Sequence, residues 1–484
     1  MVRLLLSVAC ICSCFISRAQ IIEMGPDKLY KTLQSACQAA TPGDTILIFS
    51  GTYNNGDYIS NLKGTPNAWI SIKAAPGQTV HFTGGTQAFQ LSDPEYVIIS
   101  GLNFSGQSGN GVNIDDAGTF DTPAKYIVFE NCHWYKLNAS GNSDQLKMSG
   151  VENFVIRNCT FNDGSAGGSM VDMVGCHDGL FENNVFTNGG SNCIQTKGGS
   201  SNITIIRNRF SDGGQRAINI GGSTDPQFFR PQGANTEASD IFIYSNIFEG
   251  ANAALAFVGA VNCKAINNTI INPTSWAVRI LQENTNAGML LCSNNTIRNN
   301  IFVFSETGKP AFNIGSNTQP ASFICSNNLW YNPDNLNWSG PNTPVAEPGI
   351  ILNQDPVFDD SLYHISENSP AKGNGYPTGE PLEDFFNIAF KNPPSIGAAE
   401  YSIKTSTETA FHPRNVEIWP NPFTNKIYVK CYTSTSDRIL ILNIHGKVVA
   451  EVKAGEMAEI DASQWPVGIY FIQNEHFTQK IIKQ

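Results

Sequence analysis

The sequence predicts an all-β protein, with a right-handed parallel β-helix solenoid followed by a small C-terminal β-sandwich. Two observations predict the solenoid. An asparagine with a large apolar side chain close behind it recurs along the chain, mostly every 22 to 32 positions, and such a period is typical of stacked coils. Between these anchors, β-branched and aromatic runs such as residues 203–206 and 241–244 are too short for helices. We therefore expect parallel strands.

The residue types at the nine anchors have a physical reason. Each coil turns sharply between strands, and asparagine tolerates the left-handed backbone conformation that such a turn requires. Stacked coils lie about 4.8 Å apart, so asparagine side chains can hydrogen-bond from coil to coil while aromatic rings stack inside. The apolar anchors, each preceded within three positions by one or two asparagines, are Phe104, Trp134, Phe161, Phe186, Phe210, Phe248, Ile270, Phe302 and Trp330.

Composition and charge restrict the function. The chain has 484 residues, of which 41% are hydrophobic and only 15% charged, so it can bury an extended core. Its formal net charge of −11 argues against a nucleic-acid partner, because phosphate binding needs a concentrated basic surface. Neutral partners, or partners bridged by cations, fit better.

The chain divides into four predicted segments. Residues 1–19 are predicted as a signal peptide, with a short apolar run and small residues before the cleavage site. The β-helix is expected over 20–402, capped at its start by an amphipathic helix over 31–40, and a polar linker over 403–414 follows. Nine cysteines remain after the signal peptide. Cys132 and Cys159 occupy equivalent places in consecutive repeats and are either a disulfide or buried core residues, of which we favour the second.

Residues 415–484 predict a separate domain, because short strands joined by turns are typical of a small β-sandwich. The order of Pro420-Asn421-Pro422, a Gly446-Lys447 turn, a Gly468-Ile469-Tyr470-Phe471 strand and a lysine-flanked end resembles the sorting domain of type IX secretion. The resemblance implies export through the periplasm, with the type IX secretion machinery as a partner, to a secreted or cell-surface location. We expect no transmembrane segment and a monomer.

A strip of polar residues on one face of the β-helix is the candidate site. Polar and apolar residues alternate in four consecutive short runs, which places the polar side chains outward. Asp172 lies eleven positions after Phe161 and Lys197 eleven positions after Phe186, so we expect Asp172 and Lys197 to be near neighbours. Outward polar residues can also simply meet water. The strip comprises Lys147, Asp172, Gln195, Lys197, Asn219 and Arg216.

A long loop beside the strip adds candidates for substrate binding. The repeat expands to 38 residues between Phe210 and Phe248, and the inserted loop contains Phe228, Phe229 and Arg230. Adjacent aromatic rings can stack on sugars or can pack the loop down, and we expect one ring to do each.

Four further polar residues have less support. His177, in a turn after the Asp172 strand, is a secondary candidate for binding substrate. For Asp115, Asp116 and Asp144 we favour plain exposure to water.

Lys197, followed by a polar turn, a strand, Asn208-Arg209-Phe210 and an arginine about one coil later, is similar to chondroitinase B-like and alginate lyases. This resemblance implies that Lys197 is the base of a β-elimination, with Arg216 assisting and calcium masking the uronate carboxylate. The chain departs from the lyase pattern by carrying Thr196 before the lysine, and Gly190 and Asn192 where those lyases have acidic calcium ligands. Calcium, if bound, would be held by Asp144 and Asp172.

Two function classes therefore remain open. The first is an exported lyase that cleaves uronate-containing polysaccharide, with Lys197, Arg216 and Asp172 as catalytic residues and Lys147, Gln195, Asn219, Phe228, Phe229, Arg230 and His177 binding substrate. The second is a non-catalytic carbohydrate-binding or surface adhesion protein, for which amide and aromatic side chains on a long face suffice. Glycoside hydrolysis ranks below the lyase, because the paired aspartates and Gly-His-Gly of polygalacturonase-like enzymes are absent from the sequence.

Overall fold

A computed structural model describes residues 19–305 and 310–402, and of the C-terminal part residues 416–419, 423–431, 438–443, 447–453, 457–466, 468–473 and 478–483. These residues form two compact units, one ending at Tyr401 and one starting after it. The predicted signal peptide, apart from Ala19, the predicted linker over 403–414 and the Pro420-Asn421-Pro422 motif lie outside the described residues.

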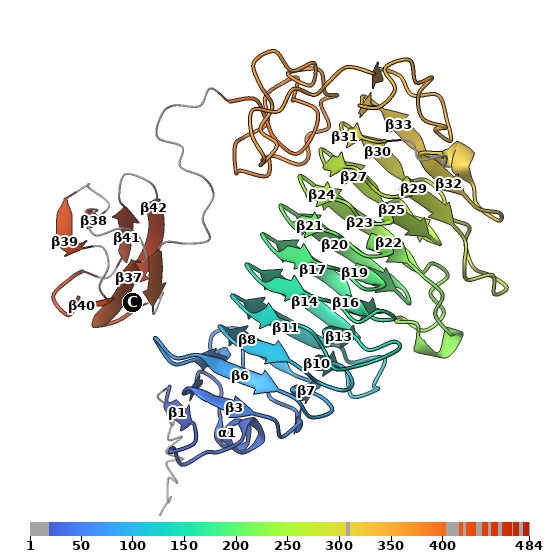
Figure 1. Ribbon diagram of the computed structural model, residues 1–484. Helices are drawn as coiled ribbons and strands as arrows, with labels where there is room; N and C mark the ends of the chain where they lie inside the picture. Colours follow the sequence, from blue (N-terminus) through green and yellow to red (C-terminus); the bar gives the residue numbers. More distant parts are fainter. Residues whose placement is uncertain are drawn as a thin grey trace, which may run out of the picture. The chain divides into compact units, whose positions relative to one another are not determined.

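The first unit is a parallel β-helix of three long sheets, and most coils give one strand to each sheet (Figure 1). Sheet A contains β1 (Ile21–Met24), β2 (Thr45–Ile48), β5 (Ile70–Ala74), β8 (Glu95–Ser100), β11 (Ala124–Glu130), β14 (Val151–Arg157), β17 (His177–Glu182), β20 (Ser200–Ile206), β23 (Ala238–Tyr244), β26 (Ala260–Val261), β27 (Lys264–Ile266), β30 (Thr296–Arg298) and β33 (Ile324–Ser326). Sheet B contains β3 (Gly51–Tyr53), β6 (Val80–Thr83), β9 (Asn103–Ser105), β12 (His133–Trp134), β15 (Thr160–Asn162), β18 (Val185–Thr187), β21 (Arg209–Ser211), β24 (Ile247–Glu249), β28 (Thr269–Ile271), β31 (Ile301–Val303), β34 (Leu329–Tyr331) and β35 (Ile351–Leu352). Sheet C contains β4 (Asp57–Ser60), β7 (Phe89–Ser92), β10 (Val112–Asp115), β13 (Leu146–Ser149), β16 (Ser169–Val174), β19 (Asn192–Lys197), β22 (Arg216–Gly221), β25 (Ala253–Val258), β29 (Trp276–Leu281) and β32 (Phe312–Ile314).

A column of aromatic rings runs through the core of the β-helix, as the repeat predicts. The Trp134 and Phe161 rings stack with centroids 4.5 Å apart, and the stack continues through Phe186, Phe210 and Phe248 at 4.9, 4.9 and 4.7 Å. All five side chains are buried. The apolar anchors therefore join neighbouring coils by ring contact as well as by burial.

The asparagine anchors do two jobs, and in several coils two adjacent residues share them. The first residue of each pair takes the left-handed conformation, as at Asn183 with φ of 55°. The second is buried and forms the ladder: the Asn208 side-chain amide donates to the Asn246 amide oxygen at 3.1 Å, and that of Asn246 donates to Asn268 at 3.1 Å. The ladder satisfies buried amides without help from water.

The two ends of the β-helix are capped differently. At the start, α1 (Leu33–Ala39) is capped by the Thr32 side chain and buries Leu33, Ala36 and Cys37, within the helix expected over 31–40. At the other end, residues 353–401 fold back over the turns between sheets A and B, where the Asn267 amide donates to the Ser395 carbonyl at 2.8 Å. Two short 3-10 helices, η1 (Pro226–Phe228) and η2 (Pro320–Ser322), lie in loops.

The second unit consists of two small antiparallel sheets with a shared apolar core, as the sequence predicts. One sheet contains β36 (Val416–Trp419), β37 (Lys426–Cys431) and β40 (Met457–Asp461); the other contains β38 (Arg438–Asn443), β39 (Val448–Lys453), β41 (Gly468–Gln473) and β42 (Thr478–Lys483). Ile427, Val429, Ile441 and Ile472 are among the buried core residues.

Cysteine and membrane predictions can be compared with the part of the chain that is described. Cys132 and Cys159 are both buried and unpaired, which agrees with core residues rather than a disulfide. Within the described ranges, no helix is both long and apolar enough to cross a bilayer.

Candidate functional site

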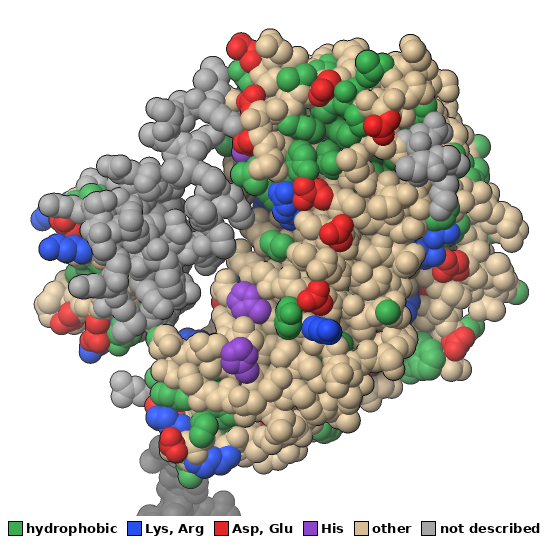
Figure 2. Space-filling model, in the orientation of Figure 1, with side chains coloured by type: hydrophobic (Ala, Val, Ile, Leu, Met, Phe, Trp, Pro, Cys, Tyr) green, Lys and Arg blue, Asp and Glu red, His purple; other side chains and the backbone are tan. Residues whose placement is uncertain are grey.

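The predicted strip lies on the outer face of sheet C. The strand register places Lys147 opposite Asp172, Asp172 opposite Gln195, and Gln195 opposite Asn219, so these four residues form one column across β13, β16, β19 and β22. Successive side chains of a strand point to opposite faces of the sheet. Because the neighbours of these four residues point into the core, their own side chains point outward. On the face of the β-helix that Figure 2 shows, most of the surface is uncharged, and the charged side chains are scattered singly or in small groups.

Lys197 lies two residues away from the register position that its spacing suggested. The register pairs Asp172 with Gln195, and Lys197 with Val174. The reason is turn length: Asp172 follows Phe161 by eleven residues, whereas Gln195 follows Phe186 by only nine. The long lysine side chain nevertheless reaches back, and its Nζ lies 3.2 Å from Oδ1 of Asp172.

A buried carboxylate shared by two lysines is the central feature of the strip. Asp172 is fully buried, and its Oδ2 accepts a hydrogen bond from Lys147 Nζ, while Lys197 Nζ lies beside Oδ1. Lys147 Nζ is also 3.5 Å from Oδ2 of Asp144. The two ammonium groups are therefore the counter-charges that a buried carboxylate requires.

The surroundings shift two pKa values in this cluster. Burial lowers the pKa of Lys147, but the charges of Asp172 and Asp144 more than compensate and leave it above its usual value. Burial, and then the negative charge of Asp172, raise the pKa of Asp144 to about 6. Asp144 also accepts a hydrogen bond at 2.8 Å from the Ser169 backbone amide. Asp144 can therefore change its protonation state near pH 6.

Asp144 and Asp172 do not fit the calcium site that the lyase resemblance implies. The Lys147 ammonium contacts both carboxylates, so it occupies the place of a cation between them. Calcium takes six to eight oxygen ligands, and no group of three or more acidic, histidine or cysteine side chains that could hold a metal occurs among the described residues. Positive charge at this point of the strip comes from lysine.

Arg216 is not placed beside Lys197. Its register partner on β19 is Asn192, five residues before Lys197, which corresponds to roughly 16 Å along the strand. The guanidinium donates to the Asn219 amide oxygen at 3.0 Å and to Oε1 of Glu283 at 2.6 Å. Arg216 therefore marks the opposite edge of the strip, and the expected pairing with Lys197 is not formed.

The inserted loop is held down by Arg230. The guanidinium makes two hydrogen bonds to Asp116, of which the one from Nη2 to Oδ1 is 2.9 Å long, and it lies 4.4 Å from the centre of the Phe120 ring. Arg230 is buried and anchors the loop. It is therefore not free to bind a substrate, which is the role that the sequence suggested for it. Asp116, expected merely to meet water, is its buried partner.

The two aromatic rings of the loop separate as expected. Phe229 is buried and packs the loop down, whereas Phe228 is 47% exposed. Of the two, only Phe228 presents a ring that can stack on a ligand.

The carboxylate of Glu237 closes the base of the same loop and was not anticipated from the sequence. It is fully buried and accepts hydrogen bonds from the Gly198 amide at 3.0 Å, the Thr224 amide at 2.7 Å and the Asn284 side chain at 2.6 Å.

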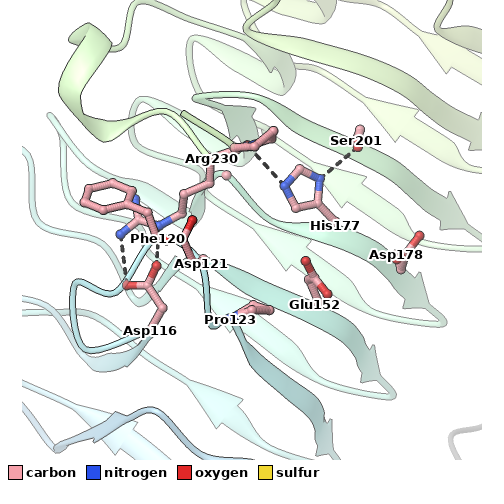
Figure 3. A pocket seen from close by; sticks show the side chains of 12 residues that line it. Asp116, Phe120, Asp121, Pro123, Glu152, His177, Asp178, Ser201 and Arg230 are labelled. Atoms are coloured by element: carbon pink, nitrogen blue, oxygen red, sulfur yellow. Dashed lines mark hydrogen bonds and ion pairs between the residues drawn. The ribbon is translucent and has the colours of Figure 1, made fainter. Parts of the chain in front are cut away.

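His177 lies at the first position of β17, in a pocket of about 410 Å³ beside the loop (Figure 3). Its Nε2 donates to the Arg230 carbonyl at 3.1 Å and its Nδ1 accepts from the Ser201 hydroxyl at 2.8 Å, because a carbonyl can only accept. Burial lowers the pKa of His177. The histidine therefore supports the loop and lies outside the strip.

Sequence reasoning missed the other residues that line this pocket. Phe120 and Asp121 come from a turn between sheets C and A, and Glu152 and Asp178 from β14 and β17. The turn residues belong to no repeated motif, so no spacing marked them.

Two family models match the chain. Residues 87–270 match the right handed beta helix region, and residues 417–484 match the secretion system C-terminal sorting domain. The chain is a right-handed β-helix protein with a type IX sorting domain. Such a domain directs a protein to the cell surface or the medium, so this β-helix protein is an exported one.

Solved structures with a similar fold have low sequence identity. An alginate lyase from Paenibacillus sp. str. FPU-7 is 16% identical, with a TM-score of 0.44 over 63% of this chain and 99% of that one. Pectate lyase Pel9A is 16% identical, with a TM-score of 0.47 over 80% and 98%. A rhamnogalacturonan lyase is 13% identical, with a TM-score of 0.48 over 64% and 87%. No curated protein sequence matches this β-helix protein.

Proposed function

We propose that this exported β-helix protein acts on a uronate-containing polysaccharide, which it binds along the strip from Lys147 to Asn219. The observation that carries the proposal is the pair of lysines around Asp172. A chain with a net charge of −11 places the ammonium groups of Lys147 and Lys197 beside the same carboxylate on the outer face of sheet C. Their side chains keep 23% and 16% of their surface exposed. A carboxylated sugar is a ligand that such groups recognise.

The neighbouring residues suit the rest of a sugar chain. Gln195 and Asn219 continue the same column with amide groups, which can donate to and accept from hydroxyl groups. Phe228, on the adjoining loop, adds an exposed ring. The strip therefore offers charge, amide and aromatic contacts in a row, as binding of an extended polysaccharide requires.

The catalytic form of the proposal is β-elimination with Lys197 as the base. In this reaction the proton next to the uronate carboxylate passes to Lys197 Nζ, a carbon–carbon double bond forms, and the glycosidic carbon–oxygen bond breaks. The leaving oxygen takes up a proton, from the protonated Lys197 or from water, and becomes the hydroxyl group of one new chain end, while the other new end is an unsaturated uronate. A base must be unprotonated, whereas the ion pair with Asp172 uses the ammonium form. Lys147 can neutralise Asp172 alone when Lys197 takes part in the reaction.

The competing function is binding without cleavage. It is favoured by the engagement of both lysines with Asp172 and by the distance between Lys197 and Arg216, which leaves no arginine beside the proposed base. Both forms of the proposal place the polysaccharide on the same strip and differ only in whether the polymer becomes shorter.

The test is a screen of the full chain on alginate, polygalacturonate and glycosaminoglycans, measured by ultraviolet absorbance, viscosity and binding. Lyase activity gives new absorbance from unsaturated uronates that Lys197→Ala abolishes, while Lys264→Ala, a lysine on β27 of sheet A, serves as the matched control. Binding without loss of viscosity, weakened by Lys197→Ala, establishes the non-catalytic form. The proposal is wrong if no acidic polysaccharide binds, or if no absorbance appears and Lys197→Ala binds as the wild type does.

A further inference from the structure

A second column of residues, on sheet A, departs from the residue pattern of the fold. In each coil one residue of this sheet has a left-handed backbone conformation, with φ between 52° and 60°. The strand pairing skips this residue. From β8 to β23 and on to the following coils these residues are Tyr96, Tyr126, Asn153, Asp178, Asn202, Asp240, Asn262 and Asn294. Six of the eight are asparagine or aspartate, which adopt this conformation readily, whereas a bulky residue with positive φ is an outlier.

The two tyrosines at this column form a half-buried aromatic cluster with Trp69. The Tyr96 and Tyr126 rings stack at 4.4 Å with 10° between their planes, and the Trp69 ring stands edge-on to them at 5.4 and 6.4 Å. None of the three side chains is buried. The cluster therefore lies on the outside of sheet A, where its rings do not contribute to the core, and backbone strain kept at a surface points to a function.

The ring stack ends at a pocket. An open pocket of about 410 Å³ is lined by Trp69 and Tyr126 but not by Tyr96, which covers one face of the Tyr126 ring. The pocket continues over Asn153, Asp178 and Asn202 of the next three coils. The pocket thus occupies the space that further aromatic rings would fill if the next coils also had tyrosine at this position. The face of the Tyr126 ring that Tyr96 does not cover forms one end of the pocket.

The remaining walls identify the chemistry of the occupant. Val128, Val155 and Leu180 form an apolar floor, and the amide and carboxylate groups of Asn153, Asp178 and Asn202 run along one side. An aromatic face, an apolar floor and a row of hydrogen-bonding groups match a pyranose ring, which has an apolar C–H face and hydroxyl groups at its rim. The Asp178 carboxylate, exposed in the pocket, disfavours a uronate here by like charge.

We propose that this surface, formed by Trp69, Tyr126, Asn153, Asp178 and Asn202, is a second carbohydrate-binding site that takes uncharged pyranose residues stacked on Tyr126. The site lies on sheet A, whereas the strip lies on sheet C. It does not depend on the proposed reaction, and it would attach the protein to neutral glycans while the strip engages an acidic one.

Two substitutions test the site in opposite ways. Tyr126→Asn removes the ring and installs a residue type that the same column uses in other coils. Asn153→Tyr adds the next ring of the stack and fills the pocket; the fold accepts tyrosine at this position in the two preceding coils. Tyr135→Asn, which removes a tyrosine that is 56% exposed next to sheet B, is the control.

The experiment is affinity electrophoresis of the full chain in gels that contain xylan, glucomannan or mixed-linkage β-glucan, with circular dichroism to verify folding. We expect at least one neutral polysaccharide to retard the wild type, with roughly tenfold weaker binding of both Tyr126→Asn and Asn153→Tyr and unchanged binding of Tyr135→Asn and Lys197→Ala. The site is refuted if none of the three polysaccharides retards the wild type, or if both pocket variants bind as tightly as it does. A loss caused by Lys197→Ala would instead place the neutral glycan on the strip.

Discussion

Lys147 and Asp172 face each other at the same register position of adjacent coils, and the ammonium group of the first donates a hydrogen bond to the fully buried carboxylate of the second. This contact links the fold to the proposed function. The strand register brings the two side chains together. The buried charge of Asp172 requires a counter-charge, which Lys147 supplies. The exposed part of the Lys147 side chain faces the solvent, where a polysaccharide would lie.

Removal of the Lys147 ammonium should destabilise the β-helix. Lys147→Met keeps the length of the side chain but leaves Asp172 with Lys197 as its single counter-charge. Breaking a buried ion pair from one side typically costs 3–5 kcal/mol, and the remaining lysine should reduce the loss in the free energy of unfolding to about 2 kcal/mol. Urea-induced unfolding, followed by circular dichroism, measures the change.

The double variant separates charge from packing. Lys147→Met combined with Asp172→Asn should be less destabilised than Lys147→Met alone, because the uncompensated carboxylate is gone. Lys264→Met, which removes a lysine that lies over the Phe242 ring, is the control. Equal effects of Lys147→Met and Lys264→Met would show that Asp172 does not need Lys147.

The stability of the strip should depend on pH through Asp144. Burial, and then the charge of Asp172, raise the pKa of Asp144 from 3.8 to about 6. Because the folded-state pKa is the higher one, the contribution of Asp144 to stability is fully present below pH 3.8 and is lost as the pH rises through about 6. Asp144→Asn removes this titration, so its midpoint of thermal unfolding should rise relative to the wild type between about pH 4 and about pH 7.

The comparison needs a second aspartate that carries the same change in charge. Asp334→Asn replaces an exposed aspartate of the same unit, and its midpoint should differ from the wild type by a constant amount across this range. A pH-independent difference for Asp144→Asn as well would contradict the raised pKa.

Regular features of the fold could be predicted from the sequence because each coil repeats them. The anchors Trp134, Phe161 and Phe186 predict the aromatic stack, and their asparagines predict the ladder, since every coil must solve the same turn and the same burial. The outward column of Lys147, Asp172, Gln195 and Asn219 followed from alternation along single strands.

The features that vary between coils could not be predicted in this way. Lys197 is two residues out of the expected register because the turn before β16 is longer than the turn before β19. The alternation of residues within one strand carries no information about the turn length in the next coil. Arg230 binds Asp116 across 114 residues, a contact fixed only when the loop folds onto the coils. The left-handed backbone conformation of Tyr96 and Tyr126 could not be predicted, because tyrosine is a residue type typical of ordinary extended strands.

The contact between Arg230 and Asp116 should control the mobility of the inserted loop. The Arg230 side chain lies over two turns where only glycine fits: a Cβ at Gly150 would approach Arg230 Nε to 2.6 Å, and one at Gly175 would approach its Cβ to 2.4 Å, both at positive φ. Arg230→Lys keeps the charge but loses the paired hydrogen bonds to Asp116, because an ammonium group cannot match a carboxylate with two parallel donors.

The expected result is local opening without global unfolding. Cleavage by a protease within residues 222–237 should accelerate on the order of tenfold in Arg230→Lys, since losing about 1.4 kcal/mol changes an opening equilibrium by that factor, while the midpoint of thermal unfolding changes little. Arg157→Lys, at an exposed ion pair with Glu130, should leave the cleavage rate unchanged. Because Phe228 belongs to the same loop, Arg230→Lys should also weaken polysaccharide binding at the strip. A normal cleavage rate in Arg230→Lys would mean that Phe229 and Glu237 suffice to hold the loop.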